Sequence, residues 1–219
     1  MPGCRHQLVD SGEPAESNDA DGESAVGEHG EGVCGRVHTT HDTPAAMEPE
    51  LDRAAVARFI EAAGARLTGE WLLLGGAVAA LWFDATRLTE DIDMIGLGGT
   101  TVERLALMDL AVQEGLSVEV VNSAADFFVR RVPGWEHELA LLHAGPSATI
   151  HRPSPTLFLL LKLGRLSEKD LGDCAELVRF IGVAEIDVGR VLGALDALPP
   201  SPDAALMHRR AHLRAVLLG

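Results

Sequence analysis

The sequence predicts an α/β fold, in which short buried strands alternate with helices. Two neighbouring segments indicate this arrangement. The apolar run Trp71 to Leu74 has the length of a buried strand, and the glycine pair after it opens a helix from Ala77 to Phe83. The next segment, DIDMI at 91–95, alternates polar and apolar residues as a strand does.

Periodic sequence continues on both sides of this centre. Apolar residues recur at helical spacing from Leu51 to Ile60, which predicts an amphipathic helix before the first strand. Beyond the second strand, Thr101 to Gly115 has helical periodicity. Leu116 to Asn122 is rich in β-branched residues and predicts a third strand, with Glu119 near its middle.

The last part of the chain contains predicted helices. Pro153-Ser154-Pro155 interrupts the chain, and a nearly all-apolar helix follows from Leu157 to Leu166. Ser167 then caps a second helix, with Asp170 three residues later in the position of a capping box. The remaining helices are predicted at Asp187 to Leu195 and Pro202 to Leu218.

Composition divides the chain into three regions. Residues 1–50 carry eleven acidic and two basic side chains and almost no large apolar ones, so they bury too little surface to offset the entropy lost on ordering. We therefore expect residues 1–46 to form a disordered acidic tail, and Met47 is a candidate for the true start. The α/β core is then 47–152, and 153–219 is a helical region packed on it.

Cysteines and histidines in the tail hold enough nitrogen and sulfur atoms to ligate a zinc ion. Their spacings match no ordinary zinc module, and the surrounding composition does not support a fold. We interpret them as scattered side chains rather than a metal site. They are Cys4, His6, Cys34, His38 and His41.

Charge and hydropathy exclude several classes of protein. No apolar run approaches the length of about twenty residues that spans a bilayer, and the first residues lack the features of a signal peptide, so we expect a cytoplasmic protein without membrane contacts. The three cysteines are odd in number and far apart, which argues against a disulfide framework. A net charge of −15 means that a polyanionic substrate must be held locally, by metal ions and a few placed cations.

The glycine pair and the DID segment carry the chemistry of a nucleotide site. Gly75 and Gly76 lack Cβ atoms, so a phosphate can approach the backbone at the N-terminus of the helix that they open. In a strand, Asp91 and Asp93 lie on one face while Ile92 points into the core. Two carboxylates on one face are suitable oxygen ligands for Mg²⁺ on a triphosphate.

This pattern resembles the nucleotidyltransferases of the DNA polymerase beta superfamily, especially the small bacterial members that include minimal nucleotidyltransferases and AbiEii-like toxins. In these proteins a GG or GS turn is followed by an arginine, a threonine or serine, and then DxD on the next strand. The fourteen residues between the glycine pair and the DxD are near the long end of the usual gap. The matching residues are Gly75, Gly76, Arg87, Thr89, Asp91 and Asp93.

The resemblance implies a short mixed sheet with flanking helices and a helical C-terminal region. It also implies the reaction, in which an acceptor hydroxyl attacks the α-phosphate of a nucleoside triphosphate and releases pyrophosphate. Asp91 and Asp93 would hold Mg²⁺ or Mn²⁺, and the glycine pair would cradle the β and γ phosphates. Glu119 is expected as a third carboxylate, either a metal ligand or the base, or alternatively as a solvent-facing residue of an edge strand.

A second block, TLFLLLKLGRLSEKDLGDCAELV at 156–178, resembles the later part of AbiEii-like proteins. There a lysine on one helix precedes an R/K-D…D pattern on the next helix. The matching residues here are Lys162, Lys169, Asp170 and Asp173. Lys162 lies in an apolar helix, so either Asp170 or a phosphate must neutralise it. Arg165 and Lys169 are expected either to contact the triphosphate or to be simply solvated.

The arginine and threonine before the DID segment have open roles. Arg87 either touches phosphate or orients the DID loop, and Thr89 either hydrogen-bonds beside the metal or serves as a turn residue. The acceptor is a protein, a tRNA or a small molecule, and the acidic balance leans against tRNA. Alternative functions are an inactive nucleotidyltransferase-like antitoxin or partner-binding module that binds a toxin, and an unrelated metal-dependent hydrolase.

Overall fold

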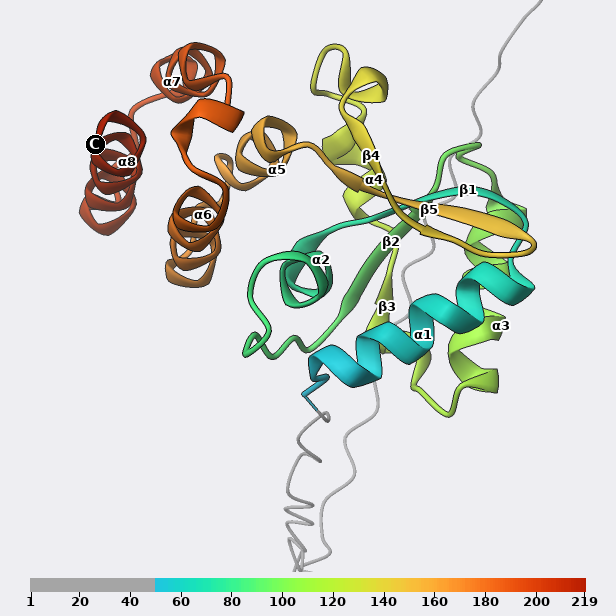
Figure 1. The fold of residues 1–219 in the computed structure, drawn as a ribbon. Helices are drawn as coiled ribbons and strands as arrows, with labels where there is room; N and C mark the ends of the chain where they lie inside the picture. Colours follow the sequence, from blue (N-terminus) through green and yellow to red (C-terminus); the bar gives the residue numbers. More distant parts are fainter. Residues whose placement is uncertain (1–49) are drawn as a thin grey trace, which may run out of the picture. The chain divides into compact units, whose positions relative to one another are not determined.

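A five-stranded mixed sheet lies at the centre of the computed structural model, which describes residues 50–219 (Figure 1). The strand order is β3-β2-β1-β5-β4. β1 pairs antiparallel with β2 and parallel with β5, β2 pairs parallel with β3, and β4 pairs antiparallel with β5. The strands are β1 (Gly69–Leu73), β2 (Ile92–Gly96), β3 (Val121–Asn122), β4 (Leu139–Ala144) and β5 (Ala148–Pro153).

Helices flank this sheet, and a helical C-terminal region follows its last strand, which confirms the predicted α/β architecture. The helices among the strands are α1 (Arg53–Arg66), α2 (Gly75–Trp82), α3 (Thr101–Gln113) and α4 (Ala125–Val129). The C-terminal helices are α5 (Pro155–Lys162), α6 (Glu168–Ile181), α7 (Val188–Ala197) and α8 (Ala204–Leu218). Short 3-10 turns are η1 (Val118–Val120), η2 (Trp135–His137) and η3 (Val183–Glu185).

The central strand β1 packs against other elements on both faces of the sheet, because successive residues of a strand point to opposite sides. Trp71 and Leu73 of β1 join a large core with α1, α2, α3 and the C-terminal helices. Leu72, with Leu74 just after the strand, belongs to a second cluster together with side chains of α4 and α5. This explains why the strand is an uninterrupted apolar run rather than an alternating one.

The second strand alternates as the sequence predicts. Ile92 and Met94 of β2 are fully buried in the large core. Asp93 lies between them and faces the other side, where Ile95 joins the second cluster. Asp91 precedes the first strand residue, so the carboxylates lie at the beginning of β2 on the face that α4 and α5 cover.

The predicted third strand is wrong over most of its length. Residues Val118–Val120 form the turn η1, and only Val121 and Asn122 pair with β2. The Ser117 side chain accepts from the Glu119 amide and caps the turn, a local hydrogen bond that competes with strand pairing. The short helix α4 was not predicted, and the helix predicted to reach Leu166 ends at Lys162.

The predictions for the acidic tail, for its cysteines and histidines and for Met47 lie outside the described residues. Among residues 50–219, no helix is both long and apolar enough to cross a lipid bilayer.

The sheet order predicts unequal costs for truncating two side chains of the β4–β5 hairpin. Ile150 on β5 is fully buried between β1 and β4, whereas Leu141 on β4 is 61% exposed. Ile150→Ala should lower the free energy of unfolding by roughly 2–5 kcal/mol in urea denaturation. Leu141→Ala should change it by about 0.5 kcal/mol at most. Equal losses would contradict this strand order.

Candidate functional site

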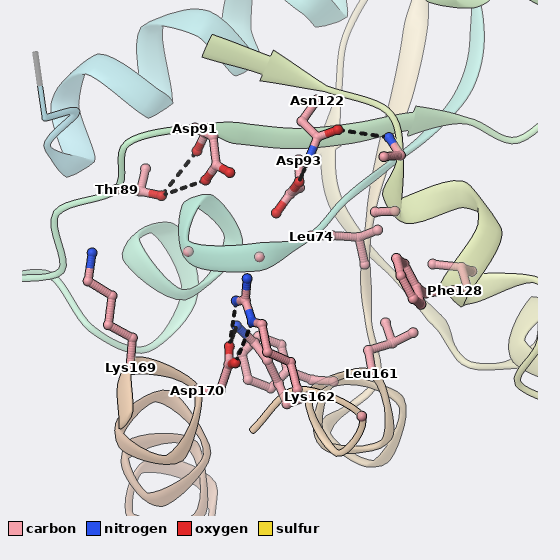
Figure 2. A pocket seen from close by; sticks show the side chains of 18 of the residues that line it. Leu74, Thr89, Asp91, Asp93, Asn122, Phe128, Leu161, Lys162, Lys169 and Asp170 are labelled. Carbon is pink, nitrogen blue, oxygen red and sulfur yellow. Dashed lines mark hydrogen bonds and ion pairs between the residues drawn. The ribbon is translucent and has the colours of Figure 1, made fainter. Parts of the chain in front are cut away.

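A cavity of about 640 Å³ opens where the beginning of β2, the start of α2, and helices α4, α5 and α6 meet (Figure 2). Its lining includes every sequence-predicted site residue except Glu119. Side chains more than eighty positions apart in the chain therefore come together in one place. These residues are Gly75, Gly76, Arg87, Thr89, Asp91, Asp93, Lys162, Arg165 and Lys169.

The glycine pair begins α2 at the edge of the cavity. Gly75 has a positive φ of 62°, and a Cβ atom there would also collide with the Asp93 carboxylate. A Cβ atom on Gly76 would lie 2.5 Å from the Thr89 hydroxyl oxygen. Both positions therefore need glycine for packing within the protein, quite apart from any ligand.

The first turn of α2 has no side-chain cap, since its N-cap residue is Leu74. The neighbouring helices α1, α5 and α6 each have a capping side chain that accepts from a backbone amide, namely Asp52, Ser154 and Ser167. The N-terminus of α2 thus keeps amide donors and the positive end of the helix dipole beside the cavity.

The two carboxylates of the DID segment line the cavity together. Asn122 donates through Nδ2 to Asp93 Oδ1 at 2.9 Å, and Thr89 donates through Oγ1 to the Asp91 carbonyl at 3.0 Å (Figure 2). Burial and the nearby Asp91 charge raise the pKa of Asp93 to about 6. The site therefore holds more negative charge than its own donors neutralise, which favours a cation between the carboxylates.

The cations on the opposite side of the cavity are held by carboxylates of α6. Lys162 donates to Asp170 at 2.8 Å and to Asp173 at 3.2 Å. Arg87 donates to Asp173 at 2.8 Å, and Arg165 donates to Asp170 at 2.9 Å. We call these five residues the ion-pair network.

The ion-pair network resolves the open question about Lys162, which the protein itself neutralises. Burial disfavours its charge, but Asp173 and Asp170 more than compensate and raise the pKa of Lys162. Burial likewise opposes the charge of Asp170, yet its bonds from Arg165, Lys162 and Ser167 keep the pKa of this carboxyl below its usual range. Lys162 and Asp170 are therefore both charged at neutral pH.

Two of the cations that line the cavity, Arg165 of the ion-pair network and Lys169, have exposed side chains. The side chain of Arg165 is 78% exposed, and that of Lys169 is 65% exposed. Lys169 pairs with the exposed Glu90 at 2.6 Å. Either side chain can turn toward a ligand without leaving a buried cation unpaired.

Glu119 does not line the cavity. It is exposed on η1 and bonds to the Ser117 hydroxyl instead. The residue in register with Asp93 on β3 is Asn122, an amide where the sequence predicted a carboxylate nearby. The expectation that Glu119 lies beside the DID carboxylates fails because the third strand is shorter than predicted. A two-residue strand places only Val121 and Asn122 beside β2.

An apolar wall completes the cavity and was missed from sequence. Leu74, Phe128 and Leu161 converge on it from β1–α2, α4 and α5 (Figure 2). Phe128 is 60% exposed, although it is a large apolar ring. The only signal for it in the sequence is the pair Phe127-Phe128 in a polar segment. Because this wall completes a lining of carboxylates and cations, the cavity has a charged half and an apolar half.

The residues present fit a divalent metal that is shared with a ligand. Within residues 50–219, no group of three or more histidine, cysteine, aspartate or glutamate side chains is arranged to hold a metal ion. Asp91 and Asp93 supply two carboxylates, with the Asn122 amide beside them. Mg²⁺ is usually bound in this way, through one or two carboxylates with the remaining oxygens from phosphate and water.

Comparison with protein-family models, with curated proteins and with solved structures finds no match for this chain.

The raised pKa of Asp93 predicts a pH-dependent gain from Asp93→Asn in metal-free protein. Ionised Asp93 destabilises the fold above about pH 6, and this cost disappears below pH 4, where the carboxyl is protonated in the folded and unfolded states. The variant should be more stable by roughly 1–3 kcal/mol at pH 7.5 in EDTA. Urea denaturation between pH 4 and 8 measures this, and a gain that does not change with pH would contradict the cause.

Lys162 and Lys169 predict opposite responses to the same substitution. Lys162→Met leaves two buried carboxylates without their shared cation and should cost about 3–5 kcal/mol of unfolding free energy. Lys169→Met removes only an exposed pair and should cost about 1 kcal/mol at most. Thermal or urea denaturation compares the two, and a mild effect at Lys162 would show that the network contributes little.

Proposed function

We propose that this protein is a Mg²⁺- or Mn²⁺-dependent nucleotidyltransferase that moves a nucleoside monophosphate from a nucleoside triphosphate to an acceptor hydroxyl. One observation carries the proposal. The two carboxylates Asp91 and Asp93 line the same cavity as the uncapped, glycine-rich start of α2. A divalent metal site thus lies beside an anion-binding helix terminus, which is the combination that a metal–triphosphate requires.

Each part of the cavity has a role in this proposal. Asp91 and Asp93 would hold the metal, and the backbone amides at Gly75 and Gly76 would bind the β and γ phosphates. The apolar wall at Phe128 and Leu161 accepts the base or ribose. When bound, the metal stabilises the attacking and leaving oxygens.

The transfer itself breaks one bond and forms one. The acceptor hydroxyl oxygen bonds to the α-phosphorus, while the bond from that phosphorus to the bridging oxygen breaks and its electron pair leaves on pyrophosphate. The hydroxyl proton passes to water. Positioning and charge stabilisation supply most of the catalysis in reactions of this kind.

The contacts divide the predicted phosphate ligands into two groups. Arg165 and Lys169 are exposed at the mouth and are the proposed triphosphate contacts. Lys162 and Arg87 instead position the walls of the cavity, because turning either one to a ligand would leave Asp173 with fewer partners in a buried place. Thr89 is buried and supports the Asp91 backbone.

The resemblance to polymerase-beta-superfamily nucleotidyltransferases remains part of this proposal, as does a place in a toxin–antitoxin pair. The acceptor is a protein, a nucleic acid or a small molecule.

A second candidate function is a partner-binding module without turnover. The position of Asn122 favours it, because β3 brings an amide rather than a third carboxylate to Asp93, and Glu119 lies outside the cavity.

Labelled nucleotides test the proposal directly. The full chain is incubated with each α-labelled nucleoside triphosphate, Mg²⁺ or Mn²⁺ and a bacterial lysate, and label on RNA, protein or small molecules is measured. Asp91→Asn with Asp93→Asn should abolish transfer, because the metal loses both carboxylates. Asp109→Asn, which removes an exposed carboxylate of α3, is the matched control and should keep full transfer. Transfer that survives the double substitution would show that Asp91 and Asp93 are not the ligands of a catalytic metal.

Glu119→Gln extends this experiment to the third carboxylate. Since Glu119 is exposed on η1, the variant should transfer at the rate of the unchanged protein within about twofold. A loss of about a hundredfold, the range for lost acid–base assistance, would show that η1 rearranges to bring Glu119 to the site.

A further inference from the structure

A second hollow, of about 590 Å³, lies next to the candidate site. Residues of α3, β3 and α4 line it, and Asn122 and Ala124 line both hollows. The two hollows therefore adjoin at Asn122, whose side chain donates to Asp93 at the start of β2. We call the exposed side chains of the second hollow the α4 surface, which consists of Arg104, Phe127, Arg130 and Arg131.

The α4 surface gathers three arginines in a chain of net charge −15. Arg130 pairs with Asp126 at 2.7 Å. Arg104 donates to the Thr101 hydroxyl, and Arg131 stacks over Phe127, so within residues 50–219 neither has a carboxylate partner. By contrast, the arginines and lysines that line the candidate site are all paired with acids.

Two exposed aromatic rings accompany these arginines. Phe127 is 55% exposed and Phe128 is 60% exposed, with ring centroids 5.5 Å apart. Phe127 lines the second hollow and Phe128 lines the candidate site, so the two rings connect the hollows. The Arg131 guanidinium lies 3.8 Å from the centroid of Phe127, which adds a flat cationic plane to the ring.

We propose that the α4 surface binds a single-stranded nucleic acid, whose terminal hydroxyl is the acceptor of the proposed transfer. Its phosphates would pair with Arg104 and Arg131, and its bases would stack on the rings of α4. A duplex keeps its bases stacked on one another and cannot offer them in this way. An acidic peptide would pair with the arginines but would not use the rings. The acceptor role rests on the proposed function, whereas the binding does not.

Fluorescence anisotropy with a labelled 12-nucleotide single-stranded RNA, the full chain and EDTA tests the binding without nucleotide or metal. Arg104→Gln with Arg131→Gln should weaken binding by about tenfold or more. It should also reduce the slope of log affinity against log salt by about 1.4, which is the value for two lost phosphate contacts on a single strand. Arg53→Gln with Arg58→Gln is the matched control, because it removes two exposed arginines of α1 that line neither hollow.

Phe127→Leu separates stacking from charge. The substitution keeps apolar volume and deletes the flat ring, so RNA binding should weaken by about fivefold or more while binding of base-free polyphosphate stays unchanged. Single-stranded DNA of the same sequence should bind within about tenfold of RNA, and a duplex should bind more weakly. Polyphosphate that binds as tightly as RNA, a duplex that binds equally well, or equal losses in the α1 control would each overturn the proposal.

The two proposals fail in distinguishable ways. No RNA binding, together with nucleotide transfer that depends on Asp91 and Asp93 but goes to another acceptor, overturns the α4 surface and leaves the nucleotidyltransferase. RNA binding that depends on Arg104, Arg131 and Phe127, without transfer under any condition, supports the surface and overturns the nucleotidyltransferase. The substituted side chains are exposed, so each variant should fold. Circular dichroism verifies this.

Discussion

The buried charge of Lys162, held between Asp170 and Asp173, is the contact on which the candidate site depends. Asp170 also caps its own helix and binds Arg165, while Asp173 binds Arg87 from the loop that leads to the DID segment. One set of ion pairs thus joins α5 and α6 to the loop that positions the carboxylates. Because a buried charge without its partner is costly, these elements keep their relative position, and the cavity between them persists.

On the other side of the cavity, a steric constraint replaces the electrostatic one. Gly75 leaves the space that the Asp93 carboxylate occupies, and Gly76 leaves the space beside Thr89. The glycine pair therefore brings the start of α2 close to the carboxylates. The positive end of the α2 helix dipole thus lies beside the negative charges of the DID segment. A ligand that carries both a divalent cation and phosphates is attracted to both, which is why a metal–nucleotide fits this cavity better than either ion alone.

The two hollows differ in how their charges are balanced. In the candidate site the cations are paired with acids, so a ligand must bring its own cation or displace an exposed partner such as Glu90. On the α4 surface, Arg104 and Arg131 have no carboxylate partner among residues 50–219. A net charge of −15 means that a polyanion can be held only where cations are placed locally, and the α4 surface is such a place.

Local sequence determined the elements that carry most of the chemistry. The apolar run before Gly75, the alternation in the DID strand and the Ser167–Asp170 cap are short-range patterns, and each formed as predicted because its cause lies within a few neighbouring residues. The pairing of Lys162 with Asp170 was one of two alternatives that the sequence left open.

Tertiary structure decided what long-range contacts control: that Asn122 rather than Glu119 lies beside Asp93, that Arg87 reaches Asp173, and that Phe128 lines the cavity. Strand register and helix packing place these residues, and neither is encoded by the spacing of residues along one segment.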